Sequence, residues 1–352
     1  MKKFRLGENR PLVISGPCSA ETREQTLATC TALAATGVVD MLRAGIWKPR
    51  TSPGSFEGMG AVALEWMVEA KRLTGLPVGV EVATAHHVES ALGAGVDCVW
   101  IGARTTVSPF AVQEVADALR GSGVAVLVKN PVNPDIELWA GAVKRLLAAN
   151  IQDVGLIHRG FSSFGQQKYR NAPIWPLAFE MRSRFPEMMM ICDPSHMAGS
   201  TEYIPELSQT AADLRYDGLI IESHIDPAHA LSDSCQQLTP GELGELVRSI
   251  NWRREAVDDP EFVKAIDTFR DQIDHIDSEL FSLLGRRMKI SEQIGRVKKA
   301  NDVAILQSAR WRSIEERVME QAGALGLRYE FVAAILETIH LESIRRQNDV
   351  MN

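Results

Sequence analysis

A loop dense in positive charge, Lys48-Pro49-Arg50-Thr51-Ser52-Pro53, is the first candidate for chemistry in this sequence. It follows a short apolar run that carries a third cation, Arg43. Like charges held close together repel one another, so a fold that gathers them usually binds an anion that offsets the repulsion. The two prolines restrict the backbone and so fix where the neighbouring side chains point. We interpret the loop as an anion-binding element; the alternative is a solvated basic loop.

Four side chains with metal-ligand chemistry form a second group; three end or follow a short apolar run, and the fourth lies in the loop beyond the last run. They are Cys18, His196, Glu222 and Asp233. One thiolate, one imidazole and two carboxylates suit a divalent cation of the Mn, Fe, Zn or Co type and leave positions open for a substrate. Spacing alone does not separate a ligand from a packed residue. Other histidines compete for the imidazole position, namely His86, His87, His158, His224 and His229.

The elements that must position these residues repeat along residues 11 to 250, where short β-branched or apolar runs alternate with amphipathic helical segments. The expected strands are 12–16, 41–44, 78–82, 98–102, 124–128, 154–158, 188–192 and 219–221, followed by helical segments such as 110–120 and 138–149. Eight such units in about 240 residues predict a (β/α)8 TIM barrel. An open doubly wound sheet is the alternative, but no glycine-rich dinucleotide turn follows the first run.

Cations recur at the expected carboxyl ends of these strands, where the active sites of (β/α)8 barrels lie. They are Arg43, Lys48, Arg104, Lys129 and Arg159. One cation there would mean little, but five on one face predict a ligand that carries a phosphate and a carboxylate, for which guanidinium forks are suited.

Composition limits the class of protein. The chain of 352 residues is 45% hydrophobic, which is enough for a sizeable core in two domains. Its net charge of -7 argues against general affinity for nucleic acid and directs attention to small anionic substrates. The charged amino terminus has no signal-peptide core, and no apolar run reaches the ~20 residues that span a bilayer. With 5 cysteines in irregular spacing, we expect a soluble, cytoplasmic protein in a reducing compartment.

Residues 11–250 resemble 3-deoxy-D-arabino-heptulosonate 7-phosphate (DAHP) synthase of the barrel-only lineage, the first enzyme of the shikimate pathway. The resemblance rests on the motifs at 16–19, 48–53, 102–104, 193–196 and 231–233, which follow the family's order. It implies a metal-dependent condensation of phosphoenolpyruvate with erythrose 4-phosphate, with Mn expected to serve in vitro. The implied metal ligands are Cys18, His196, Glu222 and Asp233.

The same resemblance implies the substrate contacts of the barrel. Phosphoenolpyruvate would be bound by Arg43, Lys48, Arg104, Lys129 and Arg159, with Lys48 also in a catalytic role. Arg50 and Thr51 would face the sugar phosphate. A related synthase acts on arabinose 5-phosphate, but that family typically has Lys-Ala-Asn-Arg-Ser-Ser at the position of residues 48–53. A metal-free phosphate-binding barrel without condensation activity is a further alternative.

The sequence changes character after residue 250, which we take as the end of the barrel domain. Residues 251–260 have the composition of a charged linker, and an all-helical domain is expected over 261–352. Its apolar residues form a heptad seam at Phe269, Ile273, Ile276, Leu280, Leu283, Ile290, Ile294 and Val297.

Arg287 occupies the slot of this seam between Leu283 and Ile290. A buried arginine needs an anion, so Arg287 should meet one inside a helical bundle; the alternative is a side chain that reaches out to solvent. Arg270 lies 17 positions earlier, about 25 Å away along one helix. If both serve one site, the second cation must come from an antiparallel partner helix, which predicts a homodimer.

Residues 261–350 resemble the all-helical chorismate mutases, three helices that dimerise through the long first helix. The residues that match chorismate-binding and catalytic positions are Arg270, Arg287, Lys298, Arg310 and Gln347, and Ser343 and Gln307 are expected in the same pocket. Gln307 stands where the family often has an acid, and Trp311 where a glutamate commonly accepts the substrate hydroxyl. We therefore expect a working but weak mutase. The alternatives are a regulatory module that binds chorismate or prephenate and inhibits the barrel, and a bundle that only dimerises.

Overall fold

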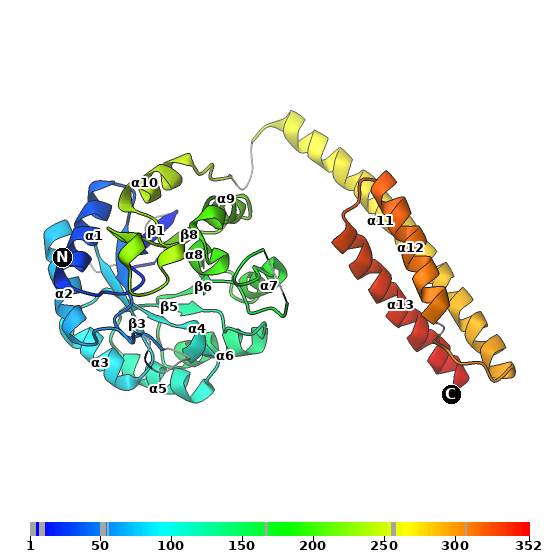
Figure 1. Cartoon of the computed structure of the whole chain (residues 1–352), viewed down its shortest axis with the longest axis horizontal. Coiled ribbons are helices and arrows are strands. Elements are labelled where there is room, and N and C mark those ends of the chain that lie inside the picture. The colour runs from blue at the N-terminus through cyan, green and yellow to red at the C-terminus, as the bar shows by residue number, and fades with distance from the viewer. Residues whose placement is uncertain are drawn as a thin grey trace. The chain divides into compact units, whose positions relative to one another are not determined.

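A computed structural model describes residues 5–6, 11–49, 54, 56–165, 168–254, 258–306 and 308–352. The chain divides into two compact units, Met1–Glu255 and Ala256–Asn352 (Figure 1). None of the described helices combines the length and the apolar character that a membrane crossing requires.

The first unit is built on a closed barrel of eight parallel strands in sequential order. The strands are β1 (Leu12–Gly16), β2 (Met41–Ala44), β3 (Val78–Val82), β4 (Cys98–Ile101), β5 (Ala125–Lys129), β6 (Val154–His158), β7 (Met190–Cys192) and β8 (Gly218–Glu222). The barrel closes where β1 pairs with β8, with Gly16 opposite Glu222. The (β/α)8 architecture expected from the repeat is confirmed, with strand ends shifted by one or two residues.

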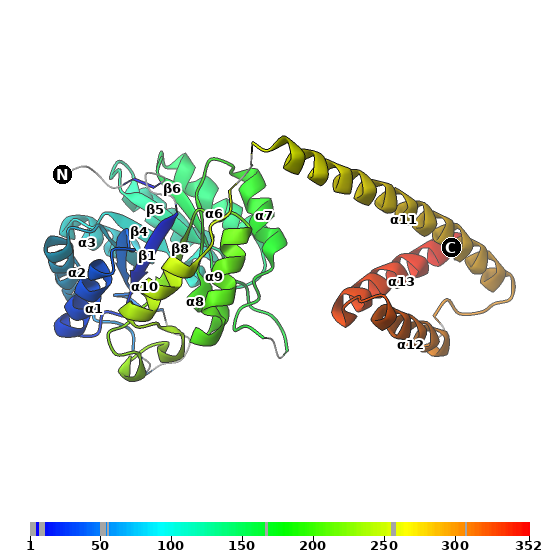
Figure 2. The ribbon, with the colours of Figure 1, turned by 90° about the horizontal axis from the view of Figure 1, so that it is seen from above.

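Helices separate the strands and surround the barrel (Figure 2). They are α1 (Arg23–Ala35), α2 (Val62–Thr74), α3 (Ala85–Ala94), α4 (Ala103–Thr106), α5 (Pro109–Leu119), α6 (Ile136–Ala148), α7 (Trp175–Arg184), α8 (Pro194–Ala198), η1 (Thr201–Tyr203), α9 (Ile204–Asp213), η2 (Pro227–His229), η3 (Ser234–Gln236) and α10 (Pro240–Ser249). Several begin at a side-chain cap that the sequence supplies. Thr22, Thr84 and Asp135 each accept a hydrogen bond from a backbone N–H of the first turn.

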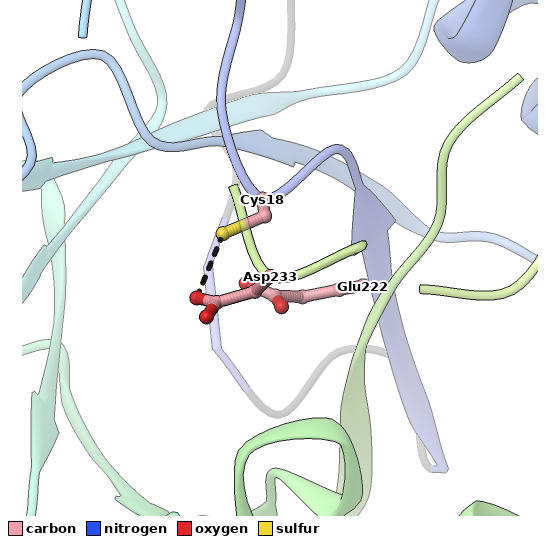
Figure 3. A group of neighbouring side chains, drawn as sticks. All are labelled: Cys18, Glu222 and Asp233. Atoms are coloured by element: carbon pink, nitrogen blue, oxygen red, sulfur yellow. Dashed lines mark hydrogen bonds between the residues drawn. The ribbon is translucent and has the colours of Figure 1, made fainter. Parts of the chain in front are cut away.

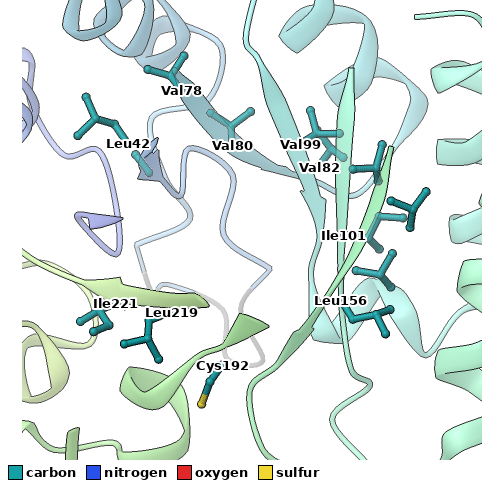
Figure 4. Close-up of a cluster of buried hydrophobic side chains, with 14 of the residues drawn as sticks. Leu42, Val78, Val80, Val82, Val99, Ile101, Leu156, Cys192, Leu219 and Ile221 are labelled. Atoms are coloured by element: carbon teal, nitrogen blue, oxygen red, sulfur yellow. The ribbon is translucent and has the colours of Figure 1, made fainter. Parts of the chain in front are cut away.

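Side chains alternate along each strand between the barrel interior and the layer beneath the helices. Cys98 and Trp100 of β4 point inward, whereas Val99 and Ile101 pack outward. Figure 4 shows part of the outer layer, including Val99 and Ile101. Because both faces are buried, the strands are continuous apolar runs, which is why the sequence pattern located them.

The second unit consists of three helices, α11 (Pro260–Ala300), α12 (Ser308–Ala324) and α13 (Tyr329–Met351). Asp259 caps α11, whose C-terminal part packs against α13; α12 packs on α13 as well (Figure 2). Within this unit the heptad seam of α11 is open to solvent. Its eight apolar side chains are between 45% and 64% exposed.

Candidate active sites

The first and last strands of the barrel bring three acidic groups together. Cys18 lies in the turn after β1, Glu222 is the last residue of β8, and Asp233 lies in the loop beyond (Figure 3). One ligand atom from each lies within 4.8 Å of the others. At Gly16 an added Cβ would stand 1.9 Å from the carbonyl oxygen of Arg43, so only glycine lets this turn approach β2 so closely.

The fourth expected ligand, His196, lies beside this cluster in the first turn of α8. Asp193, the N-cap of α8, accepts a hydrogen bond from the backbone N–H of His196 and contacts its Nδ1 at 2.9 Å. That contact turns Nε2 toward Glu222, whose Oε1 lies 3.7 Å away. The carboxylate of Asp193 therefore orients the imidazole as a partner of metal-ligating histidines commonly does.

The chemistry of the cluster fits a divalent cation. Burial raises the pKa of the Cys18 thiol to about 12, and the neighbouring carboxylate of Glu222 adds to the rise. The protonated thiol donates a hydrogen bond to Oδ2 of Asp233 at 3.3 Å. A bound cation would favour loss of that proton and offset the negative charges gathered here. Thiolate, imidazole and carboxylate donors suit transition metals rather than Mg²⁺.

Cations line a pocket beside the cluster. Its lining includes Lys48, Arg104, Lys129, Arg159 and Arg170, together with Pro49, Glu81, Ala103, His196 and Asp233. These cations come from the carboxyl ends of β2, β4, β5 and β6 and from the loop after β6. The pocket has the positive potential that an anionic substrate requires.

Most of these cations have protein partners that hold them in place. Lys48 Nζ donates to the carbonyl oxygen of Cys18 at 2.9 Å and contacts its Sγ at 3.0 Å. Lys129 Nζ pairs with Asp193 Oδ2 at 2.9 Å, and Arg159 donates to Asn171 Oδ1 at 2.7 Å. Burial lowers the pKa of Arg159 to about 10, so it keeps its charge at neutral pH.

Arg43 lies deeper than the other cations and is not among the lining residues of this pocket. Its NH1 forms an ion pair with Glu222 Oε1 at 2.7 Å, and its guanidinium stacks over the ring of Trp100. Both charged side chains are 1% exposed. Arg50 and Thr51, the expected sugar-phosphate contacts, lie outside the described residues.

The helical unit holds a second cavity, of about 580 Å³, between α11, α12 and α13. Of the expected mutase residues it brings together Arg287, Lys298, Arg310, Ser343 and Gln347. Arg287 is partly buried and donates a hydrogen bond to the Ser343 hydroxyl, and Lys298 donates to the carbonyl oxygen of Ile305. Its lining contains no carboxylate among the described residues, so no carboxylate of the lining competes with an anionic ligand for these cations.

Two expected mutase residues are not placed in this cavity. Arg270 is exposed on the N-terminal part of α11, where its partner is Asp267 at 3.2 Å. It is absent from the described lining of the cavity. Gln307 lies outside the described residues.

Comparison with known families bears on both units. Residues 2–258 match the model of the DAHP synthetase I family. The chain belongs to this family. Residues 269–348 of the same chain match the model of chorismate mutase type II. The chain thus joins a DAHP synthase barrel to a chorismate mutase segment, and both families are enzymes.

Individual relatives agree with the barrel assignment. The phospho-2-dehydro-3-deoxyheptonate aldolase of Thermotoga maritima is 29% identical over 253 residues, 72% of either chain. The crystal structure of that DAHP synthase superposes with a TM-score of 0.60 at 28% identity and covers 67% of both chains. The 2-dehydro-3-deoxyphosphooctonate aldolase of Nitratidesulfovibrio vulgaris is 28% identical over 70% of this chain and 94% of its own.

Sequence reasoning missed two residues of these sites in the DAHP synthase and its fused helices. Arg170 reaches the barrel pocket from a loop, and its NH1 contacts Asp233 Oδ1 and Gln236 Oε1, both at 3.0 Å. His340 lines the helical cavity and stacks on Trp311, with ring centroids 3.9 Å apart. Neither stands at a strand end or in the seam. Only the spacing of His340, three residues before Ser343 on one helix face, could have indicated it.

Proposed function

We propose that the barrel condenses phosphoenolpyruvate with erythrose 4-phosphate to form 3-deoxy-D-arabino-heptulosonate 7-phosphate, with a divalent metal as cofactor. The observation that supports this is that metal-ligand groups and a cationic pocket lie side by side at one end of the barrel. A cluster of metal-ligand groups, Cys18, Glu222 and Asp233, adjoins a pocket lined by cations. Condensation of two phosphorylated substrates needs both, because the anions must be aligned against their mutual repulsion.

The residues at this end of the barrel would have separate roles in the condensation. Lys129 and Arg159, at the ends of adjacent strands, would bind the anionic groups of phosphoenolpyruvate, whose enol carbon is itself the nucleophile. Lys48 bridges the pocket and the metal cluster through its contact with Cys18. Arg43 does not line this pocket and would instead keep the carboxylate of Glu222 ionised for the metal through their ion pair. A metal bound by Cys18, His196, Glu222 and Asp233 would polarise the aldehyde of the sugar phosphate.

A chelator tests the metal requirement. Condensation activity should vanish in excess chelator and return when Mn²⁺ is added back. Activity that persists in chelator would favour a metal-free mechanism.

Running the same assay with arabinose 5-phosphate in place of erythrose 4-phosphate tests which sugar phosphate is the substrate, because the chain also resembles the phosphooctonate aldolases. We expect phosphate release with erythrose 4-phosphate and little with arabinose 5-phosphate.

We further propose that the helical unit rearranges chorismate to prephenate. The cavity that gathers Arg287, Lys298 and Arg310 supports this. The rearrangement is unimolecular and needs only a cationic pocket that holds the reactive conformer and stabilises charge on the breaking ether bond. Arg287→Ala should abolish prephenate formation and leave condensation largely intact. Unchanged prephenate formation would leave ligand binding or dimerisation as the role of this unit.

A homodimer formed through α11 is the assembly that we propose. Eight half-exposed apolar side chains along one helix are a surface that a second copy would cover. Arg270 lies on the N-terminal part of α11 and the cavity on the C-terminal part, so an antiparallel partner could supply its Arg270 to the cavity. Sedimentation should show a dimer, and Leu280→Asp on the seam should shift it toward monomer.

Feedback by prephenate is the final part of the proposal. Joining the enzyme of a late step to that of the first step provides a physical route by which product binding alters the barrel. Prephenate should inhibit condensation by the whole chain but not by a chain that ends before residue 258. The shortened chain must retain condensation activity for the comparison to count. Inhibition that survives the deletion would place the effector site in the barrel.

A further inference from the structure

Gln237 connects the two segments that carry Cys18 and Asp233. Its Oε1 accepts a hydrogen bond from the backbone N–H of Cys18 at 2.9 Å, and its Nε2 donates to the carbonyl oxygen of Ser232 at 2.9 Å. One buried amide, 2% exposed, therefore spans from the turn after β1 to the residue that precedes Asp233. Both of its hydrogen-bonding functions are used on backbone groups, so a shorter or apolar side chain leaves two buried groups unsatisfied.

Two further contacts join the same two segments. The hydroxyls of Ser19 and Ser232 lie 2.5 Å apart, and the backbone N–H of Leu231 donates to Glu21 Oε1 at 2.7 Å. Together with Gln237 they form a clasp between residues 18–21 and residues 231–237. Three of the four side chains of this clasp, those of Ser19, Ser232 and Gln237, are at least 95% buried.

Two features of Asp233 could turn its carboxylate away from Cys18: its backbone conformation and its ion pair with Arg170. Its backbone has φ of 46°, a left-handed conformation that residues with a Cβ adopt uncommonly, aspartate more often than most. On its outer side Arg170, which is half exposed, binds Oδ1. The clasp holds the backbone on both sides of Asp233, so that Oδ2 still reaches the Cys18 thiol.

We propose that Gln237 is a positioning residue that fixes the separation of Cys18 and Asp233 and thereby sets the affinity of the cluster for a divalent metal. The inference rests on the proposed metal dependence and assigns a role to a residue that touches neither metal nor substrate. Loss of partners that orient metal ligands commonly costs 10-fold to 100-fold in affinity, roughly the range expected here.

Titration of the metal-stripped, full-length chain with Co²⁺ tests the inference without any activity assay. Absorption from charge transfer between the Cys18 thiolate and Co²⁺ reports binding at this cluster. Gln237→Met, which keeps the length of the side chain and removes both hydrogen bonds, should weaken Co²⁺ binding about 10-fold or more. Ser19→Ala is a smaller change that removes one hydroxyl of the clasp, and it should weaken binding by a smaller factor.

Gln209 supplies a matched control. Its amide also bridges two backbone groups, the N–H and the carbonyl oxygen of Asn251, both at 3.0 Å. Gln209→Met should bind Co²⁺ as the wild type does, with circular dichroism confirming that each variant is folded. Wild-type affinity in folded Gln237→Met would overturn the clasp. If Gln237→Met does not fold, unchanged affinity in Ser19→Ala would overturn it. A wild-type chain that shows no thiolate charge-transfer band would overturn the metal site itself, and the clasp with it.

Discussion

Deeply buried charged side chains are concentrated at the barrel end that carries the proposed site. Arg43 and Glu222 are both 1% exposed and satisfy each other at 2.7 Å. Burial opposes ionisation of Glu222, but the neighbouring imidazole of His196 and guanidinium of Arg43 hold its pKa below the ordinary value. Gln236 Nε2 also donates to its second oxygen, Oε2, at 2.7 Å. Glu222 is therefore ready to bind a cation without first losing a proton.

Removing Arg43 should be costly for this reason. Arg43→Met leaves the buried carboxylate of Glu222 without its ion pair, and breaking a buried pair in this way costs about 3–5 kcal/mol. Urea unfolding at neutral pH should show a loss of that order. As a control, Arg23→Met removes an exposed pair with Glu69 and should cost less than about 1 kcal/mol. Equal losses of unfolding free energy in the two variants would contradict the prediction that burial makes the Arg43 pair the costlier one to break.

A buried histidine predicts acid sensitivity. Burial lowers the pKa of His158 to about 3, whereas the unfolded chain binds this proton near pH 6.5. Between these values the unfolded state binds more protons, so stability falls as the pH falls, by about 1.4 kcal/mol per pH unit from this residue. His158→Gln should make the dependence shallower, as measured by urea unfolding at several pH values between about pH 4 and pH 6. Parallel curves for the two proteins would contradict the prediction.

At the scale of elements, the regular strand repeat allowed the sequence to predict residues of the barrel site. The strand repeat predicted which residues stand at the carboxyl ends, and Cys18, Glu222, Lys129 and Arg159 lie there. It could not predict Arg170, because that residue reaches the pocket through a loop whose path depends on tertiary contacts. Nor could it predict that Arg43 turns behind Glu222 instead of lining the pocket, since strand position does not fix the depth of a long side chain.

Gly295 of α11 lies where that helix packs closely against α13, and these are two of the three helices that line the cavity. An added Cβ would stand 2.6 Å from Val350 and 3.0 Å from the Cα of Gln347. Gly295→Ala should therefore push α13 away, which should lower the free energy of unfolding by about 1–3 kcal/mol and reduce mutase turnover.

Gly285 in the same helix serves as a control, because no atom lies within 4 Å of a Cβ added there. Gly285→Ala should stabilise α11 by about 0.5–1 kcal/mol. Thermal unfolding and prephenate formation measure both effects, and mutase loss in Gly285→Ala would contradict the assignment.

At the scale of the whole molecule, α11 has a half-exposed apolar seam and carries Arg270, one of the residues proposed for mutase activity, away from the cavity of its own chain. The cavity has Arg287, whereas Arg270 of the same helix points elsewhere and pairs with Asp267. The heptad pattern predicted a helical seam over residues 269–297, which lie within α11. It could not predict that Arg287 would remain only partly buried, because its burial depends on what covers the seam.

Mixing two inactive variants tests whether Arg270 acts across a dimer. Arg270→Ala and Arg287→Ala should each lack mutase turnover. Subunit exchange in an equal mixture should give half heterodimers, each with one intact site, so about a quarter of the wild-type turnover should return. The measurement is prephenate formation before and after exchange. No recovery, despite exchange shown by differently tagged chains, would mean that Arg270 is not shared between subunits.

The pairing of β1 with β8 has a consequence for the order of folding. The Cys18 and Asp233 side chains that meet there are 215 positions apart in the chain, with almost all of the first unit between them. The ligand cluster can form only after the last strand has been synthesised and the barrel has closed. A cation that bridges these residues would then act as a cross-link around a very long loop, whose closure entropy the unfolded chain would otherwise retain. Metal binding should thus stabilise the entire barrel. Removing the metal should first destabilise the pairing of β1 with β8.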